Sequence, residues 1–169
     1  MVLFQAILSS NEWQLLWKKK KSIFKLPPFA LFIIKAITPL RYNIVLIDES
    51  QEDIDYAKIS NSVVCISIMT TNARRGYEIA DSLCNKRGNT VIMGGIHASA
   101  LPQEALKHCD SVCIGEIENI WPGMLNDIEK SRLKQVYSSF AKVAPEDISS
   151  ASYIKGKYIV RNLISLTRG

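Results

Sequence analysis

Two neighbouring glycines, Gly94 and Gly95, stand where the sequence is best suited to bind a ligand. The apolar run 91–93 stops at these glycines, and a polar loop with His97 follows before a short helix can begin at Pro102. Glycine at the carboxyl end of a buried strand lets a large flat ligand approach the backbone, because no Cβ is in the way. In open α/β sheets, ligands bind at that edge. The segment therefore predicts a binding site for a broad ligand.

A second apolar run, residues 112–114, ends in the same manner at Gly115 and Glu116. Glu116 and Glu118 could be interpreted as a catalytic carboxylate pair. The sequence offers no nucleophile or electrophile beside them, so no catalytic residue is expected. Glu116 more plausibly accepts hydrogen bonds from a ligand or caps the loop that follows it.

Hydroxyl groups follow another buried run, residues 63–69. Thr70 and Thr71 come directly after it, and Ser99 lies beyond the glycine pair. We expect a crevice between the first and third strands, lined by residues 9–12 and 67–72. Its hydroxyls could meet a polar ligand, while an ordinary strand-end turn remains the alternative for the glycines.

These segments resemble a known family. Residues 94–106, residues 108–116 and the pair Trp121–Pro122 look like the amino-terminal cobalamin-binding domain of B12-dependent radical SAM proteins, and the similarity runs from about Asn43 to Tyr137. The resemblance implies cobalamin as the cofactor. With the chemistry above, the expected cobalamin-binding residues are Ser67, Thr70, Thr71, Asn72, Gly94, Gly95, Ile96, His97, Ala98, Gly115 and Glu116.

The metal ligand of many cobalamin domains is missing. Their signature Asp-x-His-x-x-Gly would fall in the first strand-to-helix turn, where this sequence has Ser-Ser-Asn-Glu-Trp-Gln at 9–14. No protein ligand to cobalt is therefore expected. His97 could coordinate cobalt, line the corrin face or hydrogen-bond within its loop, and the resemblance favours pocket lining.

The end of the sequence is similar to the strand that leads into a radical SAM cluster loop. The Cys-x3-Cys-x2-Cys motif that binds the cluster in that family is absent, and the four cysteines (65, 84, 109 and 113) are expected to be buried free thiols. We therefore expect residues 1–137 to form the cobalamin-binding domain and residues 138–169 to be a linker and the start of a radical SAM domain outside this chain. A [4Fe–4S] cluster and SAM are expected only in that longer parent protein.

Apolar runs that alternate with helical periodicity define the fold. Strands are expected over 2–8, 44–47, 63–69, 90–93 and 112–114, and helices over 29–37, 51–58, 73–87, 102–108 and 121–128, with residues 70–72 as the cap of the third helix and Gly88 as its end. Strands that are apolar on both faces indicate a parallel sheet covered by helices on both sides. We predict a doubly wound, flavodoxin-like (Rossmann-like) α/β fold with five strands in the order 2-1-3-4-5.

The composition fits one globular domain of 169 residues, with 47% hydrophobic and 22% charged residues. The cluster of lysines at 18–21 carries much of the net charge of +5 but lacks interleaved aromatic residues, so no nucleic-acid partner is expected. No apolar block approaches the ~20 residues of a membrane span. A cytoplasmic location is expected, and the oligomeric state is left open.

Two other functions remain open from the residues alone. Thr70–Asn72 at a helix start could bind the phosphate of a flavin in a flavodoxin-like or receiver-like regulatory domain. A degenerate domain that serves only for protein contact is the other. In the leading hypothesis the chain presents the corrin to a radical SAM methyltransferase or Fe–S oxidoreductase domain and has no turnover of its own.

Overall fold

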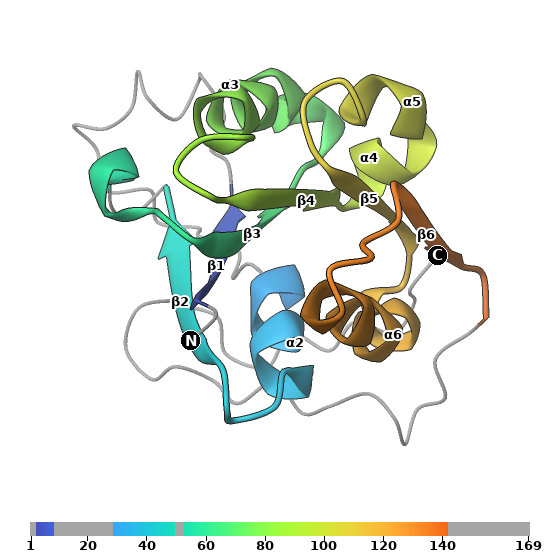
Figure 1. Ribbon diagram of the computed structural model, residues 1–169. Helices are drawn as coiled ribbons and strands as arrows, with labels where there is room; N and C mark the ends of the chain where they lie inside the picture. The colour runs from blue at the N-terminus through green and yellow to red at the C-terminus, as the bar shows by residue number, and fades with distance from the viewer. Residues whose placement is uncertain (1–2, 9–28, 50–52, 142–169) are drawn as a thin grey trace, which may run out of the picture.

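Six short strands form a single parallel sheet in the part of the chain that the structure describes. The computed structural model describes residues 3–8, 29–49 and 53–141. The strands are β1 (Leu3–Leu8), β2 (Asn43–Asp48), β3 (Ser62–Ser67), β4 (Thr90–Gly94), β5 (Ser111–Gly115) and β6 (Val136–Ser139). They lie in the order β2-β1-β3-β4-β5-β6 (Figure 1), and each neighbouring pair is parallel.

Helices cover both faces of this sheet. The α-helices are α2 (Phe29–Ile37), α3 (Ala73–Leu83), α4 (Ile96–Ala100), α5 (Pro102–Ala105) and α6 (Ile117–Glu129), and two 3-10 turns are η1 (Tyr56–Lys58) and η2 (Thr70–Asn72). Figure 1 shows α3, α4 and α5 on one face and α2 and α6 on the other. The parallel α/β architecture expected from the sequence is therefore confirmed.

Strand β3 explains why both faces need this cover. Val64 and Ile66 belong to the buried cluster on the side of α3, whereas Val63 and Cys65 belong to the cluster formed with α2 and α6. Successive side chains of a strand point to opposite faces, so a strand that is apolar throughout must be buried on both. The two clusters sandwich the sheet.

The sixth strand was not expected. β6 pairs with β5 from Val136 to Ser139, so the sheet continues past residue 137, where the sequence suggested that its regular alternation ends. Along β6 the side chains alternate between exposed and half-buried. An edge strand with one half-covered face carries no continuous apolar run, which is why this strand escaped notice. The assignment of 138–169 to another domain stays a prediction, since 142–169 lie outside the described residues.

Several helix boundaries also differ from the expectation. The stretch after Gly95 is the helix α4, and the helix expected over 102–108 is the four-residue α5. Of the helix expected over 51–58, the described part contains only η1. Such short elements offer too few residues for a helical period to be recognised.

The start and end of α3 need a similar correction. The expected cap at residues 70–72 is the turn η2; Asn72 precedes α3 but its Oδ1 accepts a hydrogen bond from the Met69 N–H (2.7 Å), and no side-chain bond caps the helix. At the other end α3 stops at Leu83, and Gly88 (φ 71°) lies in the turn before β4.

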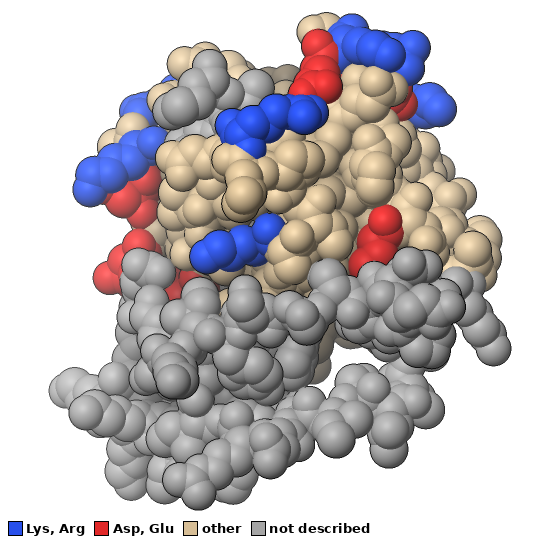
Figure 2. Space-filling model, turned by 90° about the horizontal axis from the view of Figure 1, so that it is seen from below, with Lys and Arg blue, Asp and Glu red and all other residues tan. Residues whose placement is uncertain are grey.

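Lys/Arg and Asp/Glu side chains are interspersed on the described part of the face seen in Figure 2, without a large patch of one sign. None of the described helices has the length and apolar character that a membrane crossing requires. The expected absence of a nucleic-acid partner stays a prediction.

Candidate functional site

The carboxyl ends of β3, β4 and β5 place three small residues on one face of the sheet. Side-chain alternation puts Cys65 and Cys113 on the α2/α6 face, so Ser67 and Gly115, two positions further along each strand, point the same way. Gly94 pairs with Ser67 in the β3–β4 register. The strand ends therefore form an edge with little side-chain bulk.

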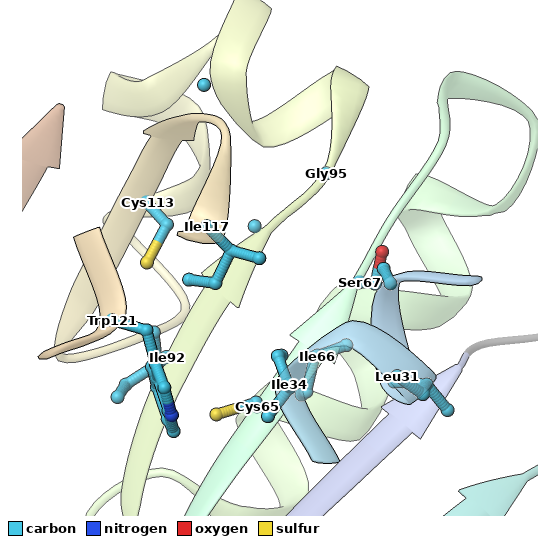
Figure 3. A pocket seen from close by; sticks show the side chains of 13 residues that line it. Leu31, Ile34, Cys65, Ile66, Ser67, Ile92, Gly95, Cys113, Ile117 and Trp121 are labelled. Atoms are coloured by element: carbon cyan, nitrogen blue, oxygen red, sulfur yellow. The ribbon is translucent and has the colours of Figure 1, made fainter. Parts of the chain in front are cut away.

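A narrow pocket of about 50 Å³ lies under this edge, between the sheet and the helices α2 and α6. Figure 3 shows Ser67 and Gly95 at its upper rim and Trp121 and Ile92 at its base. Apart from Ser67 its walls are apolar or glycine. The lining residues are Ala30, Leu31, Ile34, Cys65, Ile66, Ser67, Ile92, Gly94, Gly95, Cys113, Gly115, Ile117 and Trp121.

Two thiols belong to the pocket wall. The Cys65 and Cys113 side chains approach the gap from opposite sides in Figure 3. Burial raises the pKa of both thiols, that of Cys113 to about 12. Since a thiolate is the nucleophile and the metal ligand, these protonated groups act as apolar lining. Among the described residues no group of three His, Cys, Asp or Glu side chains could hold a metal ion.

Gly95 is required by the backbone itself. Its φ is 95°, and a Cβ there would lie 2.5 Å from the Ile68 carbonyl oxygen. Two hydrogen bonds bring these segments together, from the Ile68 N–H to the Gly94 carbonyl (3.0 Å) and from the His97 N–H to the Ile68 carbonyl (3.3 Å). Gly95 thus allows the tight passage from β4 into α4, with or without a ligand.

The backbone does not require glycine at position 94. Its φ is not positive, and an added Cβ would make ordinary contact with the Cys113 side chain at 3.6 Å. Alanine would therefore fit the fold at this position, yet its methyl group would stand in the pocket wall. The backbone therefore does not require glycine at this position.

Gly115 closes the edge toward β6. Its φ is 91°, and a Cβ would collide with the Ser139 carbonyl oxygen of β6. The Gly115 N–H donates a hydrogen bond to Ser99 Oγ (3.2 Å). Ser99, considered above as a ligand-binding hydroxyl, therefore joins α4 to the end of β5.

His97 lies on the opposite side from the pocket. It is buried, 8% exposed, and its ring lies between Thr70 and Glu104. Nδ1 lies 3.3 Å from Thr70 Oγ1, and Nε2 lies 3.5 Å from Glu104 Oε1. His97 is not among the residues that line this pocket, and its place in a cobalamin site stays a prediction.

The other residues expected to bind cobalamin are either exposed at the carboxyl edge of the sheet or buried behind it. Thr70, Thr71 and Ile96 are exposed at the carboxyl edge, Ile96 by 72%, and the half-buried Glu116 precedes α6 without capping it by a side-chain bond. Asn72 and Ala98 are buried. The described pocket lies at β3–β5, and the expected crevice between β1 and β3 stays a prediction because residues 9–12 of its lining lie outside the described part.

Sequence reasoning missed the wall contributed by the two helices. Leu31 and Ile34 of α2 and Ile117 and Trp121 of α6 line the pocket. The spacing of apolar residues along a helix does not tell which of them border a cavity. Trp121, a large side chain six residues after Gly115, was the available signal.

Comparisons with known proteins indicate the family. Residues 21–125 match a family model described as the B12 binding domain. Two methyltransferases from Chlorobaculum tepidum are similar. Bacteriochlorophyllide d C-8(2)-methyltransferase is 40% identical over 110 residues, which cover 65% of this chain and 24% of that protein. Bacteriochlorophyllide d C-12(1)-methyltransferase is 32% identical over 130 residues, which cover 73% of this chain and 28% of that protein.

The chain thus spans about a quarter of the length of these curated relatives, 24% and 28%. Among solved structures, the N-terminal domain of a hypothetical protein from Thermotoga maritima is 23% identical with a TM-score of 0.40, covering 52% of this chain and 74% of that one.

Proposed function

The chain belongs to the family of B12-binding domains, and on this premise we propose that cobalamin binds at the carboxyl edge of β3, β4 and β5. The observation that carries the proposal is Gly94, a pocket-wall glycine for which the backbone has no need. Residues that would border the cofactor are Ser67, Gly94, Gly95 and Gly115 at the pocket and Thr70, Thr71, Ile96 and Glu116 on the rim. Asn72, His97 and Ala98 would position them.

The chemistry of the lining suits the two parts of cobalamin. A corrin is a broad, flat macrocycle fringed with amides, and a rim of glycines and hydroxyls lets it approach the strand ends. The apolar slot below suits the flat aromatic base of the nucleotide tail. At about 50 Å³ the slot has room for only a few water molecules, so α2 and α6 would have to separate to admit the base.

Cobalamin, when bound, supplies a cobalt ion that can carry a methyl group or an electron. The residues of this chain bind and orient it. His97 is held between Thr70 and Glu104, so we propose that it does not coordinate cobalt. By the resemblance noted above and the methyltransferase names of the relatives, the cofactor would serve a radical SAM domain with its own [4Fe–4S] cluster and SAM.

A flavin or phosphate site receives no support from the geometry. Phosphate sites of this fold use backbone N–H groups at a helix start. Here the Asn72 N–H already donates to the Met69 carbonyl (3.0 Å), and the Asn72 Oδ1 accepts from the Met69 N–H, which closes the turn on itself.

A spectroscopic titration with hydroxocobalamin and, in parallel, FMN tests the proposal. We expect the wild type to bind the corrinoid, Gly94→Val to lower its affinity at least tenfold, about 1.4 kcal/mol, and FMN not to bind. Gly123→Val is the matched control, because a Cβ at Gly123 on α6 meets nothing within 4 Å. Circular dichroism checks that each variant is folded. Equal affinity of a folded Gly94→Val protein would place the site elsewhere.

A further inference from the structure

Thr70, His97 and Glu104 form a hydroxyl–imidazole–carboxylate chain at the carboxyl edge. The imidazole is buried, whereas Thr70 and Glu104 are exposed at its two ends. The distances are 3.3 Å from Thr70 Oγ1 to Nδ1 and 3.5 Å from Nε2 to Glu104 Oε1. Both are long for hydrogen bonds, as polar contacts of ligand-free sites commonly are.

The order of donors in this chain follows from the chemistry of its ends. The carboxyl of an exposed glutamate is ionised at neutral pH and only accepts hydrogen bonds. Tyr77 and His97 beside it hold the pKa of Glu104 below its usual range, which favours the ionised form. In its imidazole form, a His97 that faces an ionised Glu104 carries its one proton on Nε2 and leaves Nδ1 as an acceptor. The Thr70 hydroxyl, 3.3 Å from Nδ1, can then donate its hydrogen to it.

This arrangement determines the hydrogen-bonding role of the Thr70 hydroxyl. Its single hydrogen is directed at His97, so its oxygen presents only lone pairs to whatever lies on the edge. Without the histidine the hydroxyl would rotate freely and could serve as donor or acceptor. The contact of the buried His97 with Glu104 would thus make the adaptable Thr70 hydroxyl a hydrogen-bond acceptor for the ligand.

The hydroxyl also lies at the proposed site. η2 begins with Thr70 only three residues after the pocket residue Ser67. Ile68, between them, is bonded to the backbone of both Gly94 and His97. The turn that carries Thr70 is therefore fixed to the glycine pair, at the same edge where the broad macrocycle would lie.

We propose that Thr70 recognises an amide N–H on the fringe of the corrin and that His97 and Glu104 are positioning residues for this contact. The inference rests on the proposed function and deepens it, because it predicts selectivity for amidated corrinoids over those with a carboxylate or ester at the same side chain. A carboxylate on the ligand has only acceptor oxygens to place against the Thr70 oxygen, which is itself an acceptor. An ester has no N–H to donate to it.

Three ligand types separate the contribution of the N–H from that of charge. They are hydroxocobalamin, its monocarboxylic acids with one peripheral amide converted to a carboxylate, and the neutral methyl esters of those acids. A neutral hydrogen bond contributes about 0.5–1.5 kcal/mol, so we expect one methyl ester to bind the wild-type chain about three- to tenfold more weakly than hydroxocobalamin. The corresponding acid should bind more weakly still.

Variants assign the discrimination to the chain. Thr70→Ser keeps the hydroxyl and should keep the preference, whereas Thr70→Val should bind amide and ester equally. Glu104→Gln should reduce the preference, because its amide can donate to Nε2 and allow the tautomer in which Nδ1–H donates to Thr70. Glu129→Gln is the matched control: it makes the same change on an exposed carboxylate that belongs to the far end of α6 and contacts Arg41.

The outcomes distinguish the two proposals. Binding of hydroxocobalamin with an amide preference that Thr70→Val abolishes supports the inference. Binding with no preference, or with one that Thr70→Val leaves unchanged, overturns the inference alone. Failure of the folded wild-type chain to bind hydroxocobalamin overturns the proposed function together with it.

Discussion

Gly94 and Gly95 are adjacent in the sequence, but the backbone requires glycine only at Gly95. An added side chain would have different effects at the two positions. A Cβ at Gly94 would meet only the Cys113 side chain and carbonyl, whereas a Cβ at Gly95 would press on the Ile68 backbone. A variant at Gly95 therefore reports on folding before it reports on binding.

We expect Gly95→Ala to lower the free energy of unfolding by roughly 1–3 kcal/mol, the usual cost of a strained backbone conformation, with the contact to Ile68 adding to it. Urea denaturation followed by circular dichroism measures the change. Gly123→Ala is the control in a helix interior and should raise stability by about 0.5–1 kcal/mol. Wild-type stability in Gly95→Ala would mean that the passage from β4 to α4 can relax.

Some residues at the pocket could be predicted from the sequence, but the position of His97 could not. Ser67, Gly94, Gly95 and Gly115 could be recognised because small residues follow apolar runs, and the run ends meet at one edge. The side on which His97 lies could not. It depends on α4, whose five residues turn the imidazole toward Thr70 and Glu104.

At the scale of elements, α2 and α6 set the width of the pocket. One buried hydrogen bond joins them, from Trp121 Nε1 to Thr38 Oγ1 (2.7 Å), just beyond the end of α2. The Thr38 hydroxyl in turn donates to the Ile34 carbonyl. Since Trp121 and Ile34 both line the pocket, this bond holds its two helical walls together.

Thr38→Val should destabilise the fold by about 1–3 kcal/mol, because it removes the buried hydroxyl that accepts a hydrogen bond from the indole N–H. Tryptophan fluorescence during urea denaturation measures the loss. Thr90→Val, at the half-buried start of β4, makes the same change of side chain and should stay within about 0.5 kcal/mol of the wild type. Equal stability of the two variants would show that the bond between the helices contributes nothing.

The elements that could be predicted are those buried on both faces. β3, β4 and β5 stand out as apolar runs because each is covered by helices above and below. β6 does not stand out as an apolar run, because every second side chain is exposed. The half-buried Tyr137 between them donates a hydrogen bond from its hydroxyl to Asp127 Oδ2 (3.0 Å). The place of β6 in the sheet is decided by tertiary pairing with β5, which no local pattern encodes.

At the scale of the whole molecule, the polar joint between α6 and β6 makes stability depend on pH. The hydrogen bond from Tyr137 and then the Arg132 guanidinium hold the pKa of Asp127 below its usual range. A carboxyl whose pKa is lower in the folded state stabilises the fold above its unfolded value, about 3.9, and this contribution is lost as the pH falls through the folded value.

Asp127→Asn should therefore weaken the decline of stability below about pH 4, and Tyr137→Phe, which removes the first cause of the shift, should act in the same direction. Thermal unfolding between pH 3 and pH 7 measures both. A decline as steep in the two variants as in the wild type would assign acid sensitivity to other carboxyls.

Cobalamin binding makes a prediction for the molecule as a unit. A ligand that binds only the folded chain raises the free energy of unfolding by RT ln(1 + [L]/Kd), about 2.7 kcal/mol at a hundredfold excess over Kd. The melting temperature should therefore rise with the logarithm of the hydroxocobalamin concentration. Gly94→Val should lose this increase at equal concentration while melting near the wild type without ligand, because its side chain would stand in the pocket wall, its Cβ would make only ordinary contacts and no positive φ strains the backbone. A domain that serves only for protein contact would show no increase at any concentration, and one that binds the corrinoid outside this pocket would show the same increase in both proteins.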